Sequence, residues 1–176
     1  MAILNNNMKR LIILFIIIGL TACSGGKAPV GDNVVKHPPS QIEKWISNRT
    51  IDFQANWAIP QIGTQRNLID TPNFFRIKKD SVLAELPFYG RKFSGYNPSE
   101  GGISIKSIMK DINWKRNENN GTIALEFDAD GIDMEGYQII MKIFENRNAT
   151  IIVNSNRRDQ MTYRGRIQEL EVNKNE

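Results

Sequence analysis

The amino-acid sequence predicts an all-β protein with one short N-terminal helix. We expect an antiparallel meander of about eight strands, closed as a barrel or folded as a sandwich, and lipocalin-like at the level of architecture. Three observations predict this class. Apolar and polar residues alternate with period two along most of the chain from residue 51 to residue 167. Turn signals containing Gly, Asn and Asp separate these runs at short intervals. Only one segment has helical periodicity, which excludes a parallel βαβ architecture.

The predicted helix covers residues 40–48, ahead of the first strand. Ser40 and Glu43 stand three residues apart and form a capping box, in which the two side chains satisfy backbone N–H groups of the first turn. Ile42, Trp45 and Ile46 fall on one helical face. We expect this apolar face to cover an edge or the mouth of the sheet.

The predicted strands are runs in which every second residue is apolar and faces the core. The inward sets are Ile51, Phe53, Ala55 and Trp57; Phe75 and Ile77; Val82, Ala84 and Leu86; Ile103 and Ile105; Ile112 and Trp114; Ile123, Leu125 and Phe127; Tyr137, Ile139, Met141 and Ile143; Ala149, Ile151 and Val153; and Met161, Tyr163 and Ile167. Turns are predicted at Lys79-Asp80, Asp130-Gly131, Asn146–Asn148 and residues 154–159. Asn120-Gly121 is the strongest hairpin signal in the chain.

Residues 1–22 predict a lipoprotein signal peptide. Lys9 and Arg10 precede an apolar run at residues 11–18, which is too short for a membrane-spanning helix of about 20 residues and fits a secretory signal. Leu20, Thr21 and Ala22 lead directly into Cys23 and resemble the bacterial lipobox, after which the Cys receives acyl chains. Two or more acyl chains give stable anchoring. Met8 is an alternative start of translation.

The remaining chain divides into a tether at residues 23–39, a single β domain at residues 40–171 and a polar tail at residues 172–176. The tether is rich in Gly and Pro and contains His37. Ser24 is not Asp, so the retention signal of inner-membrane lipoproteins is missing, and no acidic cluster follows Cys23. We therefore expect a lipid anchor in the outer membrane, with the domain facing the periplasm.

The composition excludes several functional classes. The 176 residues include one Cys and one His, too few for an intramolecular disulfide, a CxxC zinc ribbon or an HExxH helix. There is no GxSxG sequence and no phosphate-binding Gly-rich loop. Removing Lys9 and Arg10 with the signal leaves 21 basic residues against 19 acidic residues, a net charge of +2. We predict no cofactor, no nucleic-acid partner and no enzymatic activity.

Several motifs together resemble a known family. They are Leu86-Pro87-Phe88-Tyr89-Gly90-Arg91, Gly101-Gly102-Ile103, the segment from Asn148 to Arg158, and Tyr163-Arg164-Gly165-Arg166-Ile167. In order and spacing they resemble the family of small exported proteins described as domain of unknown function 4251. Here Phe88 and Tyr89 are in swapped order, and Asp159 is an extra residue or a shift of register. The resemblance covers about residues 40–170 and implies an exported, β-rich, often lipid-anchored domain with no established activity and no catalytic residues to transfer.

Three clusters are candidates for binding. Asp128, Asp130, Asp133 and Glu135 surround Gly131 and form a weak candidate for a hard cation, although a charged hairpin tip is the simpler interpretation. Arg157, Arg158, Arg164 and Arg166, with Lys142 and Arg147 nearby, are a candidate basic face for an anionic lipid, a lipopolysaccharide phosphate or an acidic partner, or else a solvated strand surface. Phe88, Tyr89, Arg91, Phe93 and Tyr96 are a candidate binding rim, or else a plug at the end of the barrel.

Three hypotheses for function follow. The first is a lipid-anchored envelope domain that binds a small amphiphilic ligand or an envelope partner. The second is an envelope structural or inhibitor-type protein that uses a flat sheet surface. The third is a hydrolase that uses carboxylates. An empty apolar interior would favour the carrier, whereas a filled interior would favour a partner-binding protein.

Overall fold

The computed structural model describes residues 41–93 and 101–170 of the chain. The chain divides into two compact units, Met1–His37 and Pro38–Glu176, and the predicted β domain lies in the second. The predictions for the signal peptide, Leu20–Cys23, the tether, Ser40, Tyr96 and the polar tail lie outside the described residues. No helix within the described residues has the length and apolar character needed to cross a membrane.

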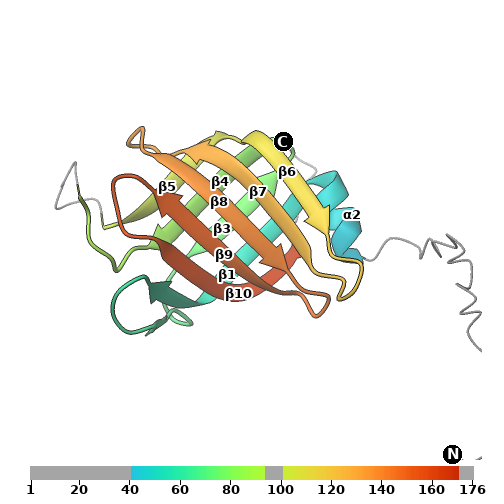
Figure 1. Cartoon of the computed structure of the whole chain (residues 1–176), viewed down its shortest axis with the longest axis horizontal. Coiled ribbons are helices and arrows are strands. Elements are labelled where there is room, and N and C mark those ends of the chain that lie inside the picture. The colour runs from blue at the N-terminus through green and yellow to red at the C-terminus, as the bar shows by residue number, and fades with distance from the viewer. Residues whose placement is uncertain (1–40, 94–100, 171–176) are drawn as a thin grey trace, which may run out of the picture. The chain divides into compact units, whose positions relative to one another are not determined.

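One helix and ten strands make up the described part of the second unit (Figure 1). They are α2 (Gln41–Asn48), β1 (Thr50–Pro60), β2 (Arg66–Asn67), β3 (Phe74–Lys78), β4 (Ser81–Pro87), β5 (Gly102–Ile108), β6 (Lys110–Arg116), β7 (Ile123–Asp130), β8 (Gly136–Ile143), β9 (Asn148–Ser155) and β10 (Met161–Glu169). The predicted turns lie between these strands. At the Asn120-Gly121 hairpin, Gly121 adopts a φ of 64°, which favours glycine.

The strands form one antiparallel sheet that nearly closes on itself. Their order is β5-β4-β3-β1-β10-β9-β8-β7-β6, with β2 paired to β1. Only Met109 separates β5, which pairs with β4, from β6, which pairs with β7. Ile105 also forms a bridge with Gly131, and the N–H of Ile132 donates to the Ser104 carbonyl at 3.0 Å. The architecture is therefore a nearly closed barrel, which confirms the predicted class and decides against the sandwich.

The interior of the barrel is filled with side chains. Apart from Trp57, Ile112 and Trp114, every residue of the predicted inward sets is buried. Phe75 on β3 and Phe127 on β7 meet across the interior with ring centroids 6.3 Å apart. Ile42, Trp45 and Ile46 of α2 join the same core and cover one end of the barrel.

The prediction that Trp57 faces the core is wrong. The register between β1 and β10 shifts between Ala55 and Trp57, so a β-bulge places one extra residue in β1. Beyond the bulge the inward position falls on Ala58, and Trp57 is 37% exposed on the outer surface. On the partner strand, a Cβ at Gly165 would lie 1.9 Å from the Gln54 carbonyl oxygen, so only glycine allows this approach of the two backbones.

The side chain of Asn73 completes the hydrogen bonding of β1 at the bulge. Its Oδ1 accepts from the N–H of Ala55 at 2.8 Å, and its Nδ2 donates to the carbonyl of the same residue at 3.0 Å. Ladder pairing between β1 and β3 ends at Phe53 and Phe75, so this buried amide replaces the next pair of backbone bonds.

Trp114 faces the inner side of the sheet, opposite the buried Leu125, but the expectation that it is buried is wrong. It is 55% exposed on β6, the last strand of the sheet order, where it borders a hollow beneath α2. Ile112, on the same strand, is only partly buried against the core.

Candidate functional site

Four connections meet at the end of the barrel opposite α2, and we call them the loop end. Their described residues are 61–73, 88–93 with 101, 131–135 and 156–160, and these lie on the left in Figure 1. The predicted binding rim lies in the second of these connections. The predicted acidic cluster and Arg157-Arg158 lie in or beside the last two, so the fold brings together segments that are far apart in the sequence.

Arg158 forms the base of the loop end. The side chain is 3% exposed, and its Nε donates to both carboxylate oxygens of Glu135 at 2.9 and 3.0 Å. Its Nη1 donates to the Gly102 carbonyl at 2.9 Å, and its Nη2 pairs with Asp133 at 3.3 Å. The guanidinium also lies 5.1 Å from the ring centre of Phe88 and 5.5 Å from that of Tyr137. The buried side chain of Arg158 therefore links its own connection to two others, the one that contains Asp133 and Glu135 and the one that contains Phe88.

The electrostatics of this cluster favour the charged forms of both partners. Burial raises the pKa of Glu135, but hydrogen bonds from Arg158 and Ser155 outweigh burial and leave the pKa below its ordinary value. Burial lowers the pKa of Arg158, and the hydrogen bond to Glu135 more than compensates. Glu135 and Arg158 therefore form a buried ion pair, and Glu135 also accepts a hydrogen bond from Ser155 Oγ.

A second ion pair holds the rim against the β9–β10 turn. Arg91 donates to the buried carboxylate of Asp159 from its backbone N–H at 2.9 Å and from Nε at 3.0 Å. The side-chain hydrogen bond, followed by the backbone bond, lowers the pKa of Asp159. The N–H of Phe93 also donates to the Arg157 carbonyl at 2.7 Å. These bonds give the described part of the rim a defined position.

Exposed apolar side chains lie on three of these connections. Met134 is 85% exposed, although it lies between Asp133 and Glu135 of the charge cluster. The other large apolar side chains exposed in these connections are Ile62, Ile69, Tyr89, Phe93 and Ile132. Arg66 stacks over Tyr89 at 5.8 Å and so links the first connection to the rim. Apolar groups on a well-ordered base are typical of binding surfaces.

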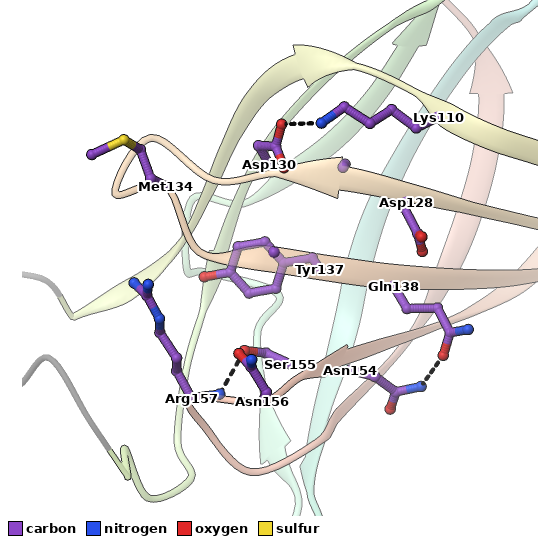
Figure 2. A pocket seen from close by; sticks show the side chains of 12 residues that line it. Lys110, Asp128, Asp130, Met134, Tyr137, Gln138, Asn154, Ser155, Asn156 and Arg157 are labelled. Atoms are coloured by element: carbon purple, nitrogen blue, oxygen red, sulfur yellow. Dashed lines mark hydrogen bonds and ion pairs between the residues drawn. The ribbon is translucent and has the colours of Figure 1, made fainter.

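A polar groove of about 710 Å³ lies beside these apolar tips (Figure 2). Met134 and Arg157 lie on the two turns that border it, and Tyr137 lies between them. Asn154 Nδ2 donates to Gln138 Oε1 at 3.1 Å on neighbouring strands, and Lys110 pairs with Asp130 at 2.6 Å. The groove offers amide, carboxylate and guanidinium groups to a polar partner.

The four acidic residues of the candidate cation site do not come together. Asp133 and Glu135 face Arg158, Asp130 faces Lys110, and Asp128 lies on the outer surface of β7. Within the described residues there is no group of three or more His, Cys, Asp or Glu side chains placed to hold a metal ion. The spacing of the acidic residues is visible in the sequence, but their pairing with Arg158 is not.

The four arginines of the candidate basic face also separate. Arg158 is buried at the loop end and Arg157 borders the polar groove, whereas Arg164 and Arg166 point outward from β10. Among the rim residues, Phe88 packs against the core as a plug, and Tyr89, Arg91 and Phe93 remain at the surface. Sequence reasoning missed Asn73 and the outward position of Trp57, because nothing in the alternation signals a bulge.

The charge cluster predicts a specific response to acid. Glu135 and Asp159 have lower pKa values in the folded state, so the unfolded chain binds more protons as the pH falls. Their contribution to stability is complete above the ordinary carboxyl pKa of about 4 and is lost as the pH falls through the folded-state values. Thermal unfolding followed from neutral to acid pH should show this loss. The Glu135→Gln and Asp159→Asn variants should each have a shallower acid dependence, and slopes equal to that of the wild type would contradict it.

Comparisons with known proteins agree with this fold. The model of a family described as a domain of unknown function (DUF4251) matches residues 37–167. No curated protein matches the chain. The chain is similar to the crystal structure of a DUF4251 family protein from Bacteroides eggerthii, with a TM-score of 0.57 and 20% identity over 72% of this chain and 83% of that chain. At this identity the similarity shows the fold alone. Because the family model covers most of the chain, the resemblance seen in the sequence is confirmed, and the protein belongs to the DUF4251 family.

Proposed function

We propose that this protein is a lipid-anchored domain of the cell envelope that binds a partner protein through its loop end and performs no catalysis. The observation that carries the proposal is the set of exposed apolar side chains above a buried charge cluster, beside a polar groove. An apolar centre with polar surroundings is the usual composition of a protein interface. The lipobox-like Leu20–Cys23 segment supports the anchor, in the outer membrane and facing the periplasm.

The filled interior favours a partner over a small amphiphilic ligand. The inward side chains meet across the barrel, and the hollow beneath α2 measures about 260 Å³. Ligand pockets usually have about 300–1,000 Å³ and enclose most of the ligand. A carrier function therefore has less support than surface recognition.

A carboxylate-based hydrolase has less support still. Glu135 and Asp133 are engaged by Arg158. Asp128 and Asp130 both line the polar groove, but they are exposed in an open site that lacks the dry apolar surroundings a carboxylic general acid requires.

Photo-crosslinking in the native envelope tests the binding surface. A photoreactive amino acid is placed at Met134 or at Phe93, and at the control position Ile108, which is also exposed but lies at the far end of β5. We expect one adduct of the same mass from both loop-end positions and none from Ile108. Adducts of equal yield at all three positions, or none at Met134 and Phe93, would reject the loop end as the binding surface.

A further inference from the structure

An outward-facing surface on β1, β8, β9 and β10 combines unpaired positive charge with exposed aromatic rings. Arg164 lies opposite Trp57 in the register of β10 and β1, and opposite Thr150 on β9, which in turn lies opposite Lys142 on β8. Arg166 follows on the same face of β10. We call Trp57, Lys142, Phe144, Arg164 and Arg166 the basic–aromatic face.

The charges of this face are uncompensated by the protein. Within the described residues, the side chains of Lys142, Arg164 and Arg166 make no hydrogen bond or ion pair. Other arginines of the domain do pair with carboxylates, namely Arg49, Arg76, Arg91, Arg116 and Arg158. A hollow of about 520 Å³ is lined by the two outward arginines together with Trp57 and Phe144, and no carboxylate among the described residues lines it. The face is therefore complementary to a negatively charged group.

The exposed aromatic rings indicate which kind of negatively charged partner this face would bind. Trp57 is 37% exposed and Phe144 is 40% exposed, and both line the hollow beside the two arginines. Tryptophan beside Arg and Lys is typical of the membrane–water interface, where the ring lies at the headgroups and the cations bind lipid phosphates. Arginine adds bidentate recognition of phosphate oxygens.

The point at which the chain enters the domain lies beside this face. Arg147, in the turn that follows Phe144, donates from Nη2 to Oε1 of Gln41 at 3.0 Å and stacks on Trp45 at 5.4 Å. The first residue of α2 is therefore held at the border of the face. Only 18 residues lead from Cys23 to Gln41, a reach of at most about 60–65 Å. A lipid on Cys23 would keep the domain close to the bilayer on which the face could dock.

We propose that the basic–aromatic face binds the phosphate headgroups of an anionic bilayer, so that the domain lies with this side on the membrane. This inference rests on the lipid anchor of the proposed function. Docking on β1 and β8–β10 uses the wall of the barrel, and the loop end at its far end stays available to a protein partner. The protein then has two attachments to the membrane, the lipid on Cys23 and a charged surface of the domain.

Fluorescence quenching by lipids with brominated acyl chains tests the docking. The full-length lipidated protein is reconstituted on phosphatidylcholine vesicles and on vesicles of a two-to-one mixture of phosphatidylcholine and phosphatidylglycerol. The Trp114→Phe background leaves Trp57 as the one exposed tryptophan among the described residues, because Trp45 is buried. We expect quenching of Trp57 on the anionic vesicles, lost at high salt because surface charges are screened. The reciprocal Trp57→Phe variant, which retains Trp114, should show no such quenching.

Charge variants distinguish binding through this surface from a general effect of the protein's net charge. The Arg164→Glu/Arg166→Glu pair should abolish quenching of Trp57. The Lys106→Glu/Lys115→Glu pair changes net charge equally on β5 and β6 and should preserve it. The milder Arg164→Gln/Arg166→Gln pair, checked by its circular dichroism spectrum, excludes misfolding as the cause of the loss. Equal quenching on both vesicle types, or loss in both charge-reversed pairs, overturns the proposal. Binding of the two arginines to poly-glutamate without quenching on vesicles also overturns it and assigns the face to an acidic protein.

Flotation distinguishes failure of the anchor from failure of the face. Flotation with phosphatidylcholine vesicles depends on the anchor alone. A protein that floats only with anionic vesicles, and needs Arg164 and Arg166 to do so, supports the face and overturns the anchor. A protein that floats with both vesicle types while Trp57 is never quenched supports the anchor and overturns the face.

Discussion

Replacing Arg158 with methionine is expected to lower the free energy of unfolding by about 3–5 kcal/mol. The change removes the cation that Glu135 and Asp133 face, and it leaves the 2%-exposed Glu135 as a buried charge without its main partner. It also removes the bond to the carbonyl of Gly102, which joins Arg158 to the start of β5. Urea unfolding at neutral pH, followed by circular dichroism, measures the effect.

A double variant separates the buried charge from the lost packing. Replacing Glu135 with leucine as well removes the orphaned carboxylate, and apolar pairs of similar volume often equal a buried ion pair in stability. We therefore expect the Arg158→Met/Glu135→Leu protein to be more stable than Arg158→Met alone. The Glu135→Leu variant completes the comparison. If the stability loss of the double variant equals the sum of the losses of Arg158→Met and Glu135→Leu, or if Arg158→Met loses less than about 1 kcal/mol, the pair is not coupled as described.

Replacing Asn73 with leucine is expected to lower the free energy of unfolding by about 2–4 kcal/mol. The side chain is buried and satisfies both the N–H and the carbonyl of Ala55, and each buried backbone group left without a partner costs about 1–3 kcal/mol. The change should also alter the emission of Trp57, because the bulge that turns this ring outward is held by Asn73. Urea unfolding and tryptophan fluorescence measure the two effects.

Asn67 provides the matched control for that substitution. It is exposed, and its Oδ1 accepts only from the nearby N–H of Ile69, a bond that water can replace. Asn67→Leu should therefore change stability by about 0.5 kcal/mol or less. Equal losses in the two leucine variants would mean that the amide of Asn73 has no special role at the bulge.

The class of the fold was predictable because period-two alternation follows directly from the geometry of a strand with one buried face. Phe75, Ile77, Ile139 and Met141 illustrate this, since each lies inside the barrel as its run predicts. Trp57 shows where alternation fails. A bulge shifts the inward–outward alternation of the strand by one residue. The amide that stabilises this bulge comes from Asn73, which lies outside any strand.

The candidate site was predictable as a set of segments but not as a set of contacts. The sequence pointed to the rim, to the acidic residues around Gly131 and to Arg157-Arg158 as separate clusters. Their meeting depends on the order of the strands, which brings the β7–β8 and β9–β10 turns and the rim to one end. Glu135 and Arg158 are 23 residues apart in the sequence, and no local sequence pattern predicts that they pair.

The pairing of the first long strand with the last has a consequence for how the chain folds. Ile51 on β1 lies opposite Glu169 on β10, so the central hydrogen-bonded ladder joins the two ends of the domain. No N-terminal fragment can complete the barrel, and β1 has half of its ladder open until β10 arrives. Folding dominated by such distant pairs is slow compared with folding through local contacts. The domain is thus expected to stay unfolded until nearly its whole length is available, a property that would suit the export across a membrane that the proposed function implies.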